Sequence, residues 1–286
     1  MSLDGLPPLR EVIAQHGLGA NKAFGQHFLL DLNLTGKIAS LAGDMSAVHA
    51  IEVGPGPGGL TRAILAAGAK SLTVVEKDDR FLGALEEIGT ASGGRLEIVQ
   101  ADALAVDEDA LLPAGGERVI LSNLPYNVGT LLLIKWLEAE PVWWTRAVLM
   151  FQREVADRVV AAPGSKAYGR LAVISQARCR VRMGLKVPAR AFTPPPKVDS
   201  AVVVLEPLPE AERFADVEAL GIVTASAFGQ RRKTLRRSLA QAAGQTTASA
   251  EDLLTTAGID PGARAETVDV AGFRRLAGAW RAAKTG

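Results

Sequence analysis

A glycine-rich loop constrains the fold of this chain more than any other feature. The segment Glu52–Gly59 reads Glu-Val-Gly-Pro-Gly-Pro-Gly-Gly and lies between a short apolar run and a helix-like run. Gly54, Gly56 and Gly59 have the G-x-G-x-x-G spacing, which allows a tight turn from a strand into a helix. The loop therefore predicts an α/β fold with a ligand site at the carboxyl ends of parallel strands.

The rest of the first two thirds of the chain repeats this strand-then-helix order. Strand-like runs cover residues 50–53, 71–76, 96–102, 118–123 and 147–152, and helix-like runs cover 60–67 and 80–88. This order predicts a parallel sheet covered by helices on both faces. Two more strand-like runs, 170–182 and 198–205, follow with no clear helix between them. We expect them to form an antiparallel pair at the sheet edge, which is typical of methyltransferases with a seven-stranded sheet.

The residues of the loop distinguish between two kinds of cofactor. A dinucleotide needs backbone amides around its pyrophosphate, but Pro55 and Pro57 have no amide hydrogen to donate. Glu52 would repel a pyrophosphate, whereas it is compatible with a cationic sulfonium and ammonium group. The loop therefore favours S-adenosylmethionine over a nicotinamide dinucleotide.

Two acids stand at the ends of the following strand-like runs. Glu76 ends the run 71–76 and can accept hydrogen bonds from both hydroxyls of a ribose. Asp102 ends the run 96–102 and can accept a hydrogen bond from the amine of an adenine. Each acid alone is compatible with an ordinary solvated strand end, but together behind the glycine loop they predict a site for an adenosyl cofactor.

A tetrapeptide after the run 118–123 indicates the reaction. Asn123-Leu-Pro-Tyr126 supplies an amide oxygen and a backbone carbonyl that can accept both hydrogens of an adenine N6 amine. These contacts would turn the nitrogen lone pair out of the ring plane and toward a methyl group. Pro125 stiffens the turn, and Tyr126 offers a ring on which an extruded base can stack. We therefore predict catalytic roles for Asn123, Leu124 and Tyr126.

The carboxy-terminal part of the chain differs in pattern and in charge. Pro207-Leu-Pro209 ends the strand-helix alternation, and residues 217–228, 232–243, 250–257 and 270–283 are helix-like. Residues 180–286 carry 16 Lys and Arg against 11 Asp and Glu, whereas residues 51–119 carry 6 against 12. We predict that Arg231, Arg232, Lys233, Arg236 and Arg237 bind RNA through its phosphates. On a helix, residues 232, 233, 236 and 237 would form one basic face, and residues 228, 235 and 239 an apolar one. The structural alternative is an ordinary solvated helix face.

Composition excludes several classes of protein. With 48% hydrophobic and 22% charged residues, the chain is expected to be globular, with no membrane span and no signal or transit peptide. Its single cysteine, Cys179, cannot form an internal disulfide or a cysteine-based metal site, which fits a reducing cytoplasm. We expect a cytoplasmic protein that contains no metal and is a monomer.

Five ordered motifs resemble those of the KsgA family of small-subunit (16S) rRNA adenine N6,N6-dimethyltransferases. They begin at Lys22, Glu52, Asn123, Ala191 and Phe228 and read KAFGQHFL, EVGPGPG, NLPY, AFTPPPKVDS and FGQRRKTL. The resemblance extends from about residue 9 to about residue 280. It implies a Rossmann-like seven-stranded methyltransferase domain over residues 1–207 and a small all-helical RNA-binding domain over residues 208–286.

The resemblance also implies further site residues and a substrate. His27 and Leu29 are expected to contact S-adenosylmethionine together with Gly54, Glu76, Asp102 and Asn123, although many members of the family carry Asn where this chain has His27. Phe192 is expected to sandwich the target base with Tyr126. The expected substrate is a pair of adjacent adenosines near the 3′ end of small-subunit rRNA, in a 30S particle during ribosome biogenesis.

Two other functions remain open at this point. The large-subunit rRNA methyltransferases that confer macrolide resistance share the glycine loop and the Asn-Leu-Pro-Tyr motif. An assembly or transcription factor could keep the fold and bind RNA without catalysis. The segment Gln230–Leu235 favours the small-subunit enzymes, and intact Glu76, Asp102 and Asn123 favour retained catalysis.

Overall fold

The structure is a computed structural model that describes residues 3–19 and 26–285. By its internal contacts the chain divides into two compact units. The first unit reaches to Ala156 and also includes Arg182–Glu206, and the second comprises Asp157–Val181 and the chain from Pro207 onward. The helical unit therefore includes residues 157–181 as well as the chain beyond residue 207, which a single boundary at residue 207 does not describe.

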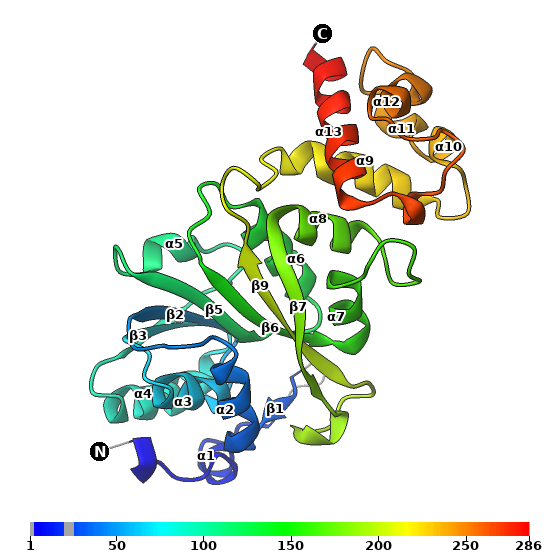
Figure 1. The fold of residues 1–286 in the computed structure, drawn as a ribbon. Helices are drawn as coiled ribbons and strands as arrows, with labels where there is room; N and C mark the ends of the chain where they lie inside the picture. Colours follow the sequence, from blue (N-terminus) through cyan, green and yellow to red (C-terminus); the bar gives the residue numbers. More distant parts are fainter. Residues whose placement is uncertain (1–2, 20–25, 286) are drawn as a thin grey trace. The chain divides into compact units, whose positions relative to one another are not determined.

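A mixed sheet forms the centre of the first unit (Figure 1). Its strands are β2 (Val48–Val53), β3 (Ser71–Glu76), β4 (Leu96–Gln100), β5 (Glu117–Asn123), β6 (Arg146–Gln152), β7 (Cys179–Val187) and β9 (Ser200–Pro207). Their order is β4-β3-β2-β5-β6-β9-β7, with β2 to β6 parallel and β9 antiparallel to β6. The predicted seven-stranded Rossmann-like sheet is confirmed.

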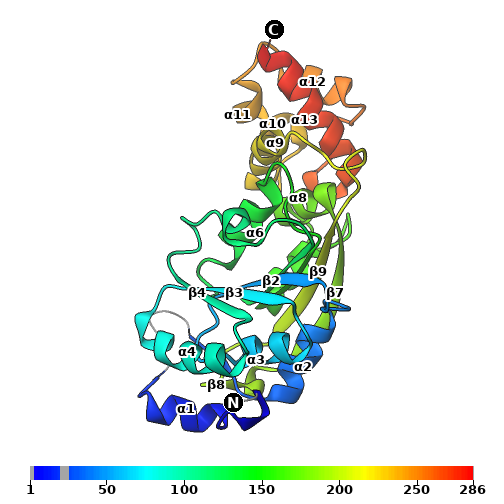
Figure 2. The same ribbon diagram turned by 90° about the vertical axis from the view of Figure 1, so that its left-hand side faces the viewer.

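Helices cover both faces of this sheet. The helical elements are η1 (Leu3–Gly5), α1 (Leu9–Gln15), α2 (Leu32–Ser40), α3 (Gly59–Ala66), η3 (Asp79–Phe81), α4 (Leu82–Ala91), α5 (Glu108–Leu111), α6 (Gly129–Glu138), α7 (Arg153–Val159) and η4 (Ala189–Ala191). Helices α2, α3 and α4 lie on one face, and α6 lies on the other (Figure 2). Ile51 and Leu121 on the central strands are fully buried, as expected for a sheet whose two faces are both covered by helices. No helix within the described ranges is long and apolar enough to cross a membrane.

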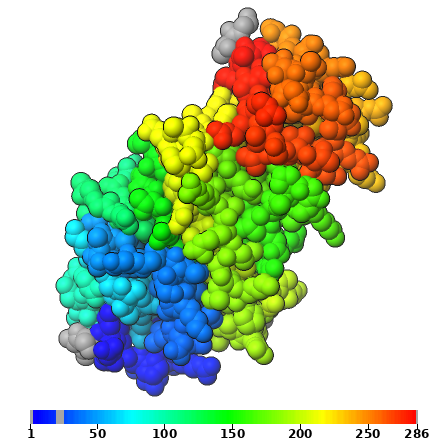
Figure 3. Space-filling model, in the orientation of Figure 1, coloured from blue at the N-terminus to red at the C-terminus, as the bar shows by residue number. Residues whose placement is uncertain are grey.

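A second, two-stranded sheet joins distant parts of the first unit. Strand β1 (Phe28–Leu29) pairs antiparallel with β8 (Phe192–Thr193), so that Leu29 lies opposite Phe192. The segment before β1 packs into the same core, because Leu9 and Val12 of α1 are buried. In Figure 3 this dark-blue segment lies beside the blue and cyan atoms of the first unit. The amino-terminal segment is thus an integral part of the unit.

The second unit is helical apart from the beginning of β7. Its helices are α8 (Arg170–Arg178), α9 (Val217–Gly229), α10 (Leu235–Ser238), α11 (Ala240–Ala243), α12 (Ala250–Thr256), η5 (Ala265–Thr267) and α13 (Val270–Thr285). Phe273 and Trp280 of α13 are fully buried, and the Trp280 indole donates a hydrogen bond to the Ala242 carbonyl at 2.8 Å. This unit therefore has a core of its own.

Two of the predicted elements are wrong. Residues 170–178 form helix α8 instead of a strand, and β7 begins only at Cys179. This helix is buried on most sides, so its sequence lacks the polar face that marks a surface helix. The predicted helix 232–243 is divided into α10 and α11, and Arg232 and Lys233 lie in the turn before α10.

Candidate active site

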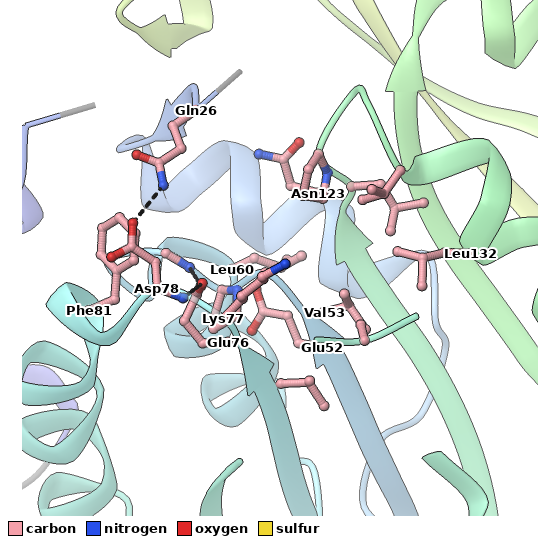
Figure 4. A pocket seen from close by; sticks show the side chains of 18 of the residues that line it. Gln26, Glu52, Val53, Leu60, Glu76, Lys77, Asp78, Phe81, Asn123 and Leu132 are labelled. Atoms are coloured by element: carbon pink, nitrogen blue, oxygen red, sulfur yellow. Dashed lines mark hydrogen bonds between the residues drawn. The ribbon is translucent and has the colours of Figure 1, made fainter. Parts of the chain in front are cut away.

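A cavity of about 690 Å³ opens at the carboxyl ends of the parallel strands in the first unit. This volume is in the range of small-molecule sites in proteins. The cavity brings together the predicted residues His27, Leu29, Gly54, Glu76, Asp102, Asn123, Leu124 and Tyr126. Figure 4 shows Asn123 on one side of it and Glu76 with Asp78 on the other. Phe192 is not among its lining residues.

The glycine loop is shaped for close approach by a ligand, but not by a pyrophosphate. Gly54, Gly56 and Gly58 have positive φ angles of 67°, 54° and 87°, which favour glycine. Their amides are already used, by the Val75 carbonyl at 2.9 Å, by Glu76 at 3.1 Å and by the Pro55 carbonyl at 3.1 Å respectively. With the two prolines, this leaves few amides to hold a phosphate. The geometry agrees with the choice of cofactor made from the sequence.

Glu76 is held rigidly at the end of β3. Its Oε2 accepts the hydrogen bond from the Gly56 amide, and its Oε1 accepts one from the Asp78 amide at 2.9 Å. Burial raises the pKa of this carboxyl, and the two amide bonds oppose that rise. Each oxygen keeps a further lone pair, so the carboxylate can still accept hydrogen bonds from ribose hydroxyls.

Glu52 lies deeper, at the end of β2, and is almost completely buried. Its Oε2 accepts a hydrogen bond of 2.6 Å from the Thr61 hydroxyl of α3. Burial, with a smaller contribution from the neighbouring Glu76 charge, raises the pKa of Glu52 to about 8 despite the lowering effect of the Thr61 hydrogen bond. A cation bound next to this carboxyl would favour its ionised form.

Asp102 is more exposed than the other two acids. Its Oδ2 accepts a hydrogen bond of 2.8 Å from the Lys77 ammonium, and its Oδ1 accepts one of 3.0 Å from the Leu104 amide. The Lys77 hydrogen bond and then the Leu104 amide lower the pKa of Asp102, so it is a carboxylate at neutral pH. It can accept a further hydrogen bond from an adenine amine at the cavity rim.

Asn123 is oriented by the backbone of His27. Its Nδ2 donates a hydrogen bond of 3.3 Å to the His27 carbonyl. This contact fixes the orientation of the amide, so its Oδ1 is the atom left to accept hydrogens from a substrate amine. The next residues form a firm turn, because the Pro125 carbonyl accepts hydrogen bonds from the Val128 and Gly129 amides at 3.2 and 2.9 Å.

His27 also lies between the two aromatic residues that were predicted to hold the base. Its ring centroid is 5.6 Å from that of Tyr126 and 6.4 Å from that of Phe192. Its Nδ1 lies 2.7 Å from the Pro194 carbonyl, so it carries the hydrogen that this contact needs. Tyr126 lines the cavity and its hydroxyl lies 3.0 Å from that of Ser200, whereas Phe192 is only 3% exposed. Phe192 is a core residue in this structure.

The structure adds residues that the sequence did not single out. Gln26 donates a hydrogen bond of 3.1 Å to Asp78, and both line the cavity. Asp78 follows Glu76 by two residues, so its place after a strand end was the available signal. Gln26 belongs to the motif that begins at Lys22, of which residues 22–25 lie outside the described residues.

The basic residues of the second unit differ in their exposure and in their hydrogen bonds. The Arg231 guanidinium donates hydrogen bonds to the carbonyls of Lys166 and Tyr168 at 3.1 and 2.7 Å, so it fixes the loop before α8. Arg236 forms an exposed ion pair of 3.7 Å with Glu251. Arg232, Lys233 and Arg237 are exposed. The neighbouring Leu235 and Leu239 are fully buried, as expected for the apolar side, but Arg232 and Lys233 precede α10, so the basic residues do not form one helix face.

The sheet order, the glycine loop and the acids at successive strand ends define the class of S-adenosylmethionine-dependent methyltransferases. A family model described as "Ribosomal RNA adenine dimethylase" matches residues 17–279. The chain therefore belongs to the ribosomal RNA adenine dimethylase family.

Individual relatives agree with this assignment. A protein of Maricaulis maris named "Ribosomal RNA small subunit methyltransferase A" is 75% identical over 99% of this chain and 98% of its own length. A protein of the same name from Mesorhizobium japonicum is 55% identical over 96% of this chain and 99% of its own.

Two solved structures are similar over most of the chain. The dimethyladenosine transferase from Plasmodium falciparum has a TM-score of 0.73 and 25% identity, and covers 87% of this chain and 96% of its own. The 23S rRNA methyltransferase ErmE has a TM-score of 0.64 and 25% identity, over 89% of this chain and 99% of its own.

Proposed function

We propose that this protein transfers methyl groups from S-adenosylmethionine to N6 of two adjacent adenosines near the 3′ end of small-subunit rRNA. The observation that carries the proposal is the orientation of Asn123, whose amide oxygen is left as an acceptor at the rim of the cofactor cavity. The choice of the small subunit is supported by the name of the relative with 75% identity, whereas ErmE, which modifies 23S rRNA, is 25% identical.

Two acids of the cavity can each hydrogen-bond a different part of the cofactor. Glu76 would accept hydrogen bonds from the ribose hydroxyls, and Asp102 would accept one from the adenine amine. Gly54, His27 and Leu29 would complete the walls around it. When bound, S-adenosylmethionine supplies an electrophilic methyl group on a sulfonium. The carboxyl of Glu52 lies behind the glycine loop, where it would favour a positively charged ligand.

The Asn-Leu-Pro-Tyr turn then prepares the substrate amine. In the first transfer, Asn123 Oδ1 and the Leu124 carbonyl would accept the two hydrogens of the amine, which turns the nitrogen lone pair toward the methyl group. In the second transfer N6 carries a single hydrogen, which one of these two oxygens would accept. With the amine held by Asn123 and Leu124, N6 would form a bond to the donated methyl carbon as the bond from that carbon to sulfur breaks. The methylated amine is then cationic and releases its proton to water, so no strong general base is needed.

The two aromatic residues have different positions relative to this amine. Tyr126 lines the cavity and offers its ring for stacking with the extruded base. We propose that Phe192 supplies the second ring, after the Pro194–Pro196 segment and the contact from His27 to Pro194 have adjusted to bound RNA. The 3% exposure of Phe192 means that this role requires such a movement.

RNA binding is assigned to the exposed basic residues of the second unit. Arg232, Lys233 and Arg237 can contact phosphates directly, and Arg236 can do so because its exposed ion pair with Glu251 is weak. Arg231 acts indirectly by holding the loop at Lys166 and Tyr168. Methyl transfer is the role proposed for residues 1–207 and RNA binding the role proposed for residues 208–286, although residues 157–181 belong by their contacts to the second unit.

We further propose that the protein acts as a cytoplasmic monomer on a 30S particle. Among the residues that the structure describes, no group of three or more His, Cys, Asp or Glu side chains could hold a metal ion. The chemistry proposed above needs none.

The decisive experiment is an incubation of the purified protein with labelled S-adenosylmethionine and unmethylated small-subunit particles, with large-subunit RNA in parallel. We expect dimethyladenosine, identified by mass, only in the small-subunit RNA. Label in large-subunit RNA would support a function like that of ErmE. Binding of S-adenosylmethionine without any transfer would instead support an assembly factor.

A further inference from the structure

The side chain of Lys135 on α6 makes three hydrogen bonds that the function proposed above does not use, one of them to Ala103, which lines the cofactor cavity. Its Nζ donates to the Ala103 carbonyl at 2.7 Å, to the Val106 carbonyl and to Glu108 Oε2 at 2.7 Å. An ammonium has three hydrogens, so all of them are used. Two of the acceptors belong to the loop that directly follows Asp102.

The other half of this arrangement is a buried carboxylate. Glu108 is 2% exposed, and its second oxygen accepts a hydrogen bond of 3.0 Å from the Trp136 indole. Trp136 is itself buried, and its carbonyl accepts a hydrogen bond of 3.0 Å from Trp144. Lys135 is half-buried and Glu108 is buried. Such an ion pair rarely adds much net stability, because desolvation of the charges offsets their attraction. Its fixed geometry is therefore the property that needs an explanation.

Helix α6 connects this ion pair to the reacting end of the cavity. The helix begins at Gly129, whose amide donates to the Pro125 carbonyl within the Asn-Leu-Pro-Tyr turn. Leu132 on the same helix lines the cavity, and Lys135 follows it by three residues on the same helix face. One helix thus contacts both the turn that would hold the substrate amine and the loop that would hold the cofactor adenine.

We infer that Lys135 is a positioning residue that fixes the Asp102–Val106 loop for recognition of the cofactor adenine, with Glu108 as its buried partner. This inference rests on the proposed role of Asp102. Without the Lys135 hydrogen bonds, the loop keeps its tie from the Leu104 amide to Asp102 but loses its attachment to α6. The carboxylate of Asp102, still paired with the Lys77 ammonium at 2.8 Å, would then be able to move together with its loop away from the adenine amine.

The test is a double variant, Lys135→Met with Glu108→Gln, which removes both charges and leaves no unpaired buried ion. The Gln side chain can still accept the hydrogen bond from Trp136. We expect the Kd for S-adenosylmethionine to rise about tenfold, while the KM for RNA stays within about twofold of the original value. The preference for S-adenosylhomocysteine over its inosine analogue, which lacks the N6 amine, should fall by a similar factor.

The chain offers a matched control in the same unit. Arg146 has a side-chain exposure of 33%, close to the 29% of Lys135, and also combines an ion pair, with Glu206, and a hydrogen bond to a carbonyl, that of Ala42. Arg146→Met should lower the melting temperature without changing the Kd for S-adenosylmethionine. An equal rise of that Kd in both variants, or none in the double variant, would overturn the inference.

Two further measurements keep the outcome clear. If the double variant does not fold, Glu108→Gln alone should raise the Kd about threefold because a neutral amide holds the ammonium less firmly, and an unchanged Kd would refute the role of Lys135. Asp102→Asn in the otherwise native chain should abolish the preference for the adenine cofactor. If that preference survives in Asp102→Asn, the proposed contact of Asp102 is wrong, independently of Lys135.

Discussion

The buried carboxyl of Glu52 leads to a prediction about stability that does not depend on any ligand. Its pKa is raised from 4.5 to about 8 by burial, so the folded protein keeps a proton there that the unfolded chain has lost. Between these two pH values the folded state binds more protons, and stability must fall as the pH rises. The contribution is fully present below pH 4.5 and is lost as the pH approaches 8.

The size of this effect follows from the same two values. One proton per molecule corresponds to about 1.4 kcal/mol for each pH unit, which gives a loss of about 2 kcal/mol between pH 6 and pH 8. In Glu52→Gln the side chain is uncharged at every pH and can still accept the hydrogen bond from Thr61. The variant should therefore lack this part of the pH dependence, while all other groups titrate nearly as before.

Urea unfolding at pH 6, 7 and 8 measures the difference. The buried Trp136 and Trp144 report on the first unit, and a Trp280→Phe background removes the signal of the buried tryptophan in the second. We expect the free energies of unfolding of the two proteins to diverge steadily, by about 2 kcal/mol over this range in favour of the variant. If the two proteins instead show parallel pH profiles of stability, Glu52 does not retain a proton in the folded state.

Three further predictions concern the site and the RNA. Asn123→Ala should leave the Kd for S-adenosylmethionine within about threefold and lower turnover about 100-fold, since one positioned polar contact in a transition state is lost; equal turnover would exclude the amine contact. Arg232→Ala with Lys233→Ala should flatten the salt dependence of RNA binding by about 1.4 units in log K against log salt, and an unchanged slope would mean that neither contacts phosphate. Gly59→Ala places a Cβ 2.3 Å from the Leu29 carbonyl oxygen, so calorimetry should show that the free energy of unfolding falls by about 1–3 kcal/mol, and cofactor binding should weaken. If this destabilisation occurs but the Kd for the cofactor is unchanged, the start of this helix does not influence the cavity.

The features that were predictable from the sequence depend on local chemistry. Positive φ angles at Gly54 and Gly56 require glycine, and Pro55 and Pro57 remove amides, so the loop is recognisable wherever it occurs. The acids Glu76 and Asp102 follow because parallel strands end at one edge of a sheet. For these residues, neighbours in sequence already determine most of the geometry.

The features that escaped prediction depend on distant partners. Arg231 donates to carbonyls more than sixty residues away, and nothing in its own basic run distinguishes it from Arg232. The helix at Arg170–Arg178 is buried on nearly all sides, so its β-branched Val173 and Ile174 suggested a strand. Phe192 stands in a family motif, yet its 3% exposure is set by contacts that a single sequence does not reveal.

The short pairing between β1 and β8 holds one wall of the cavity without being part of the seven-stranded sheet. A chain that began at residue 32 would keep all strands of the seven-stranded sheet and still lack the wall that residues 26–29 give to the cavity. The seven-stranded sheet and this wall of the site therefore rest on different strand pairings, and Phe28 and Leu29 of the wall are held by residues 192 and 193. A ligand that contacts this wall binds only when β1 and β8 are paired, so its binding free energy stabilises the pairing. Saturation with cofactor should therefore protect the amino-terminal segment from proteolysis before it protects the sheet.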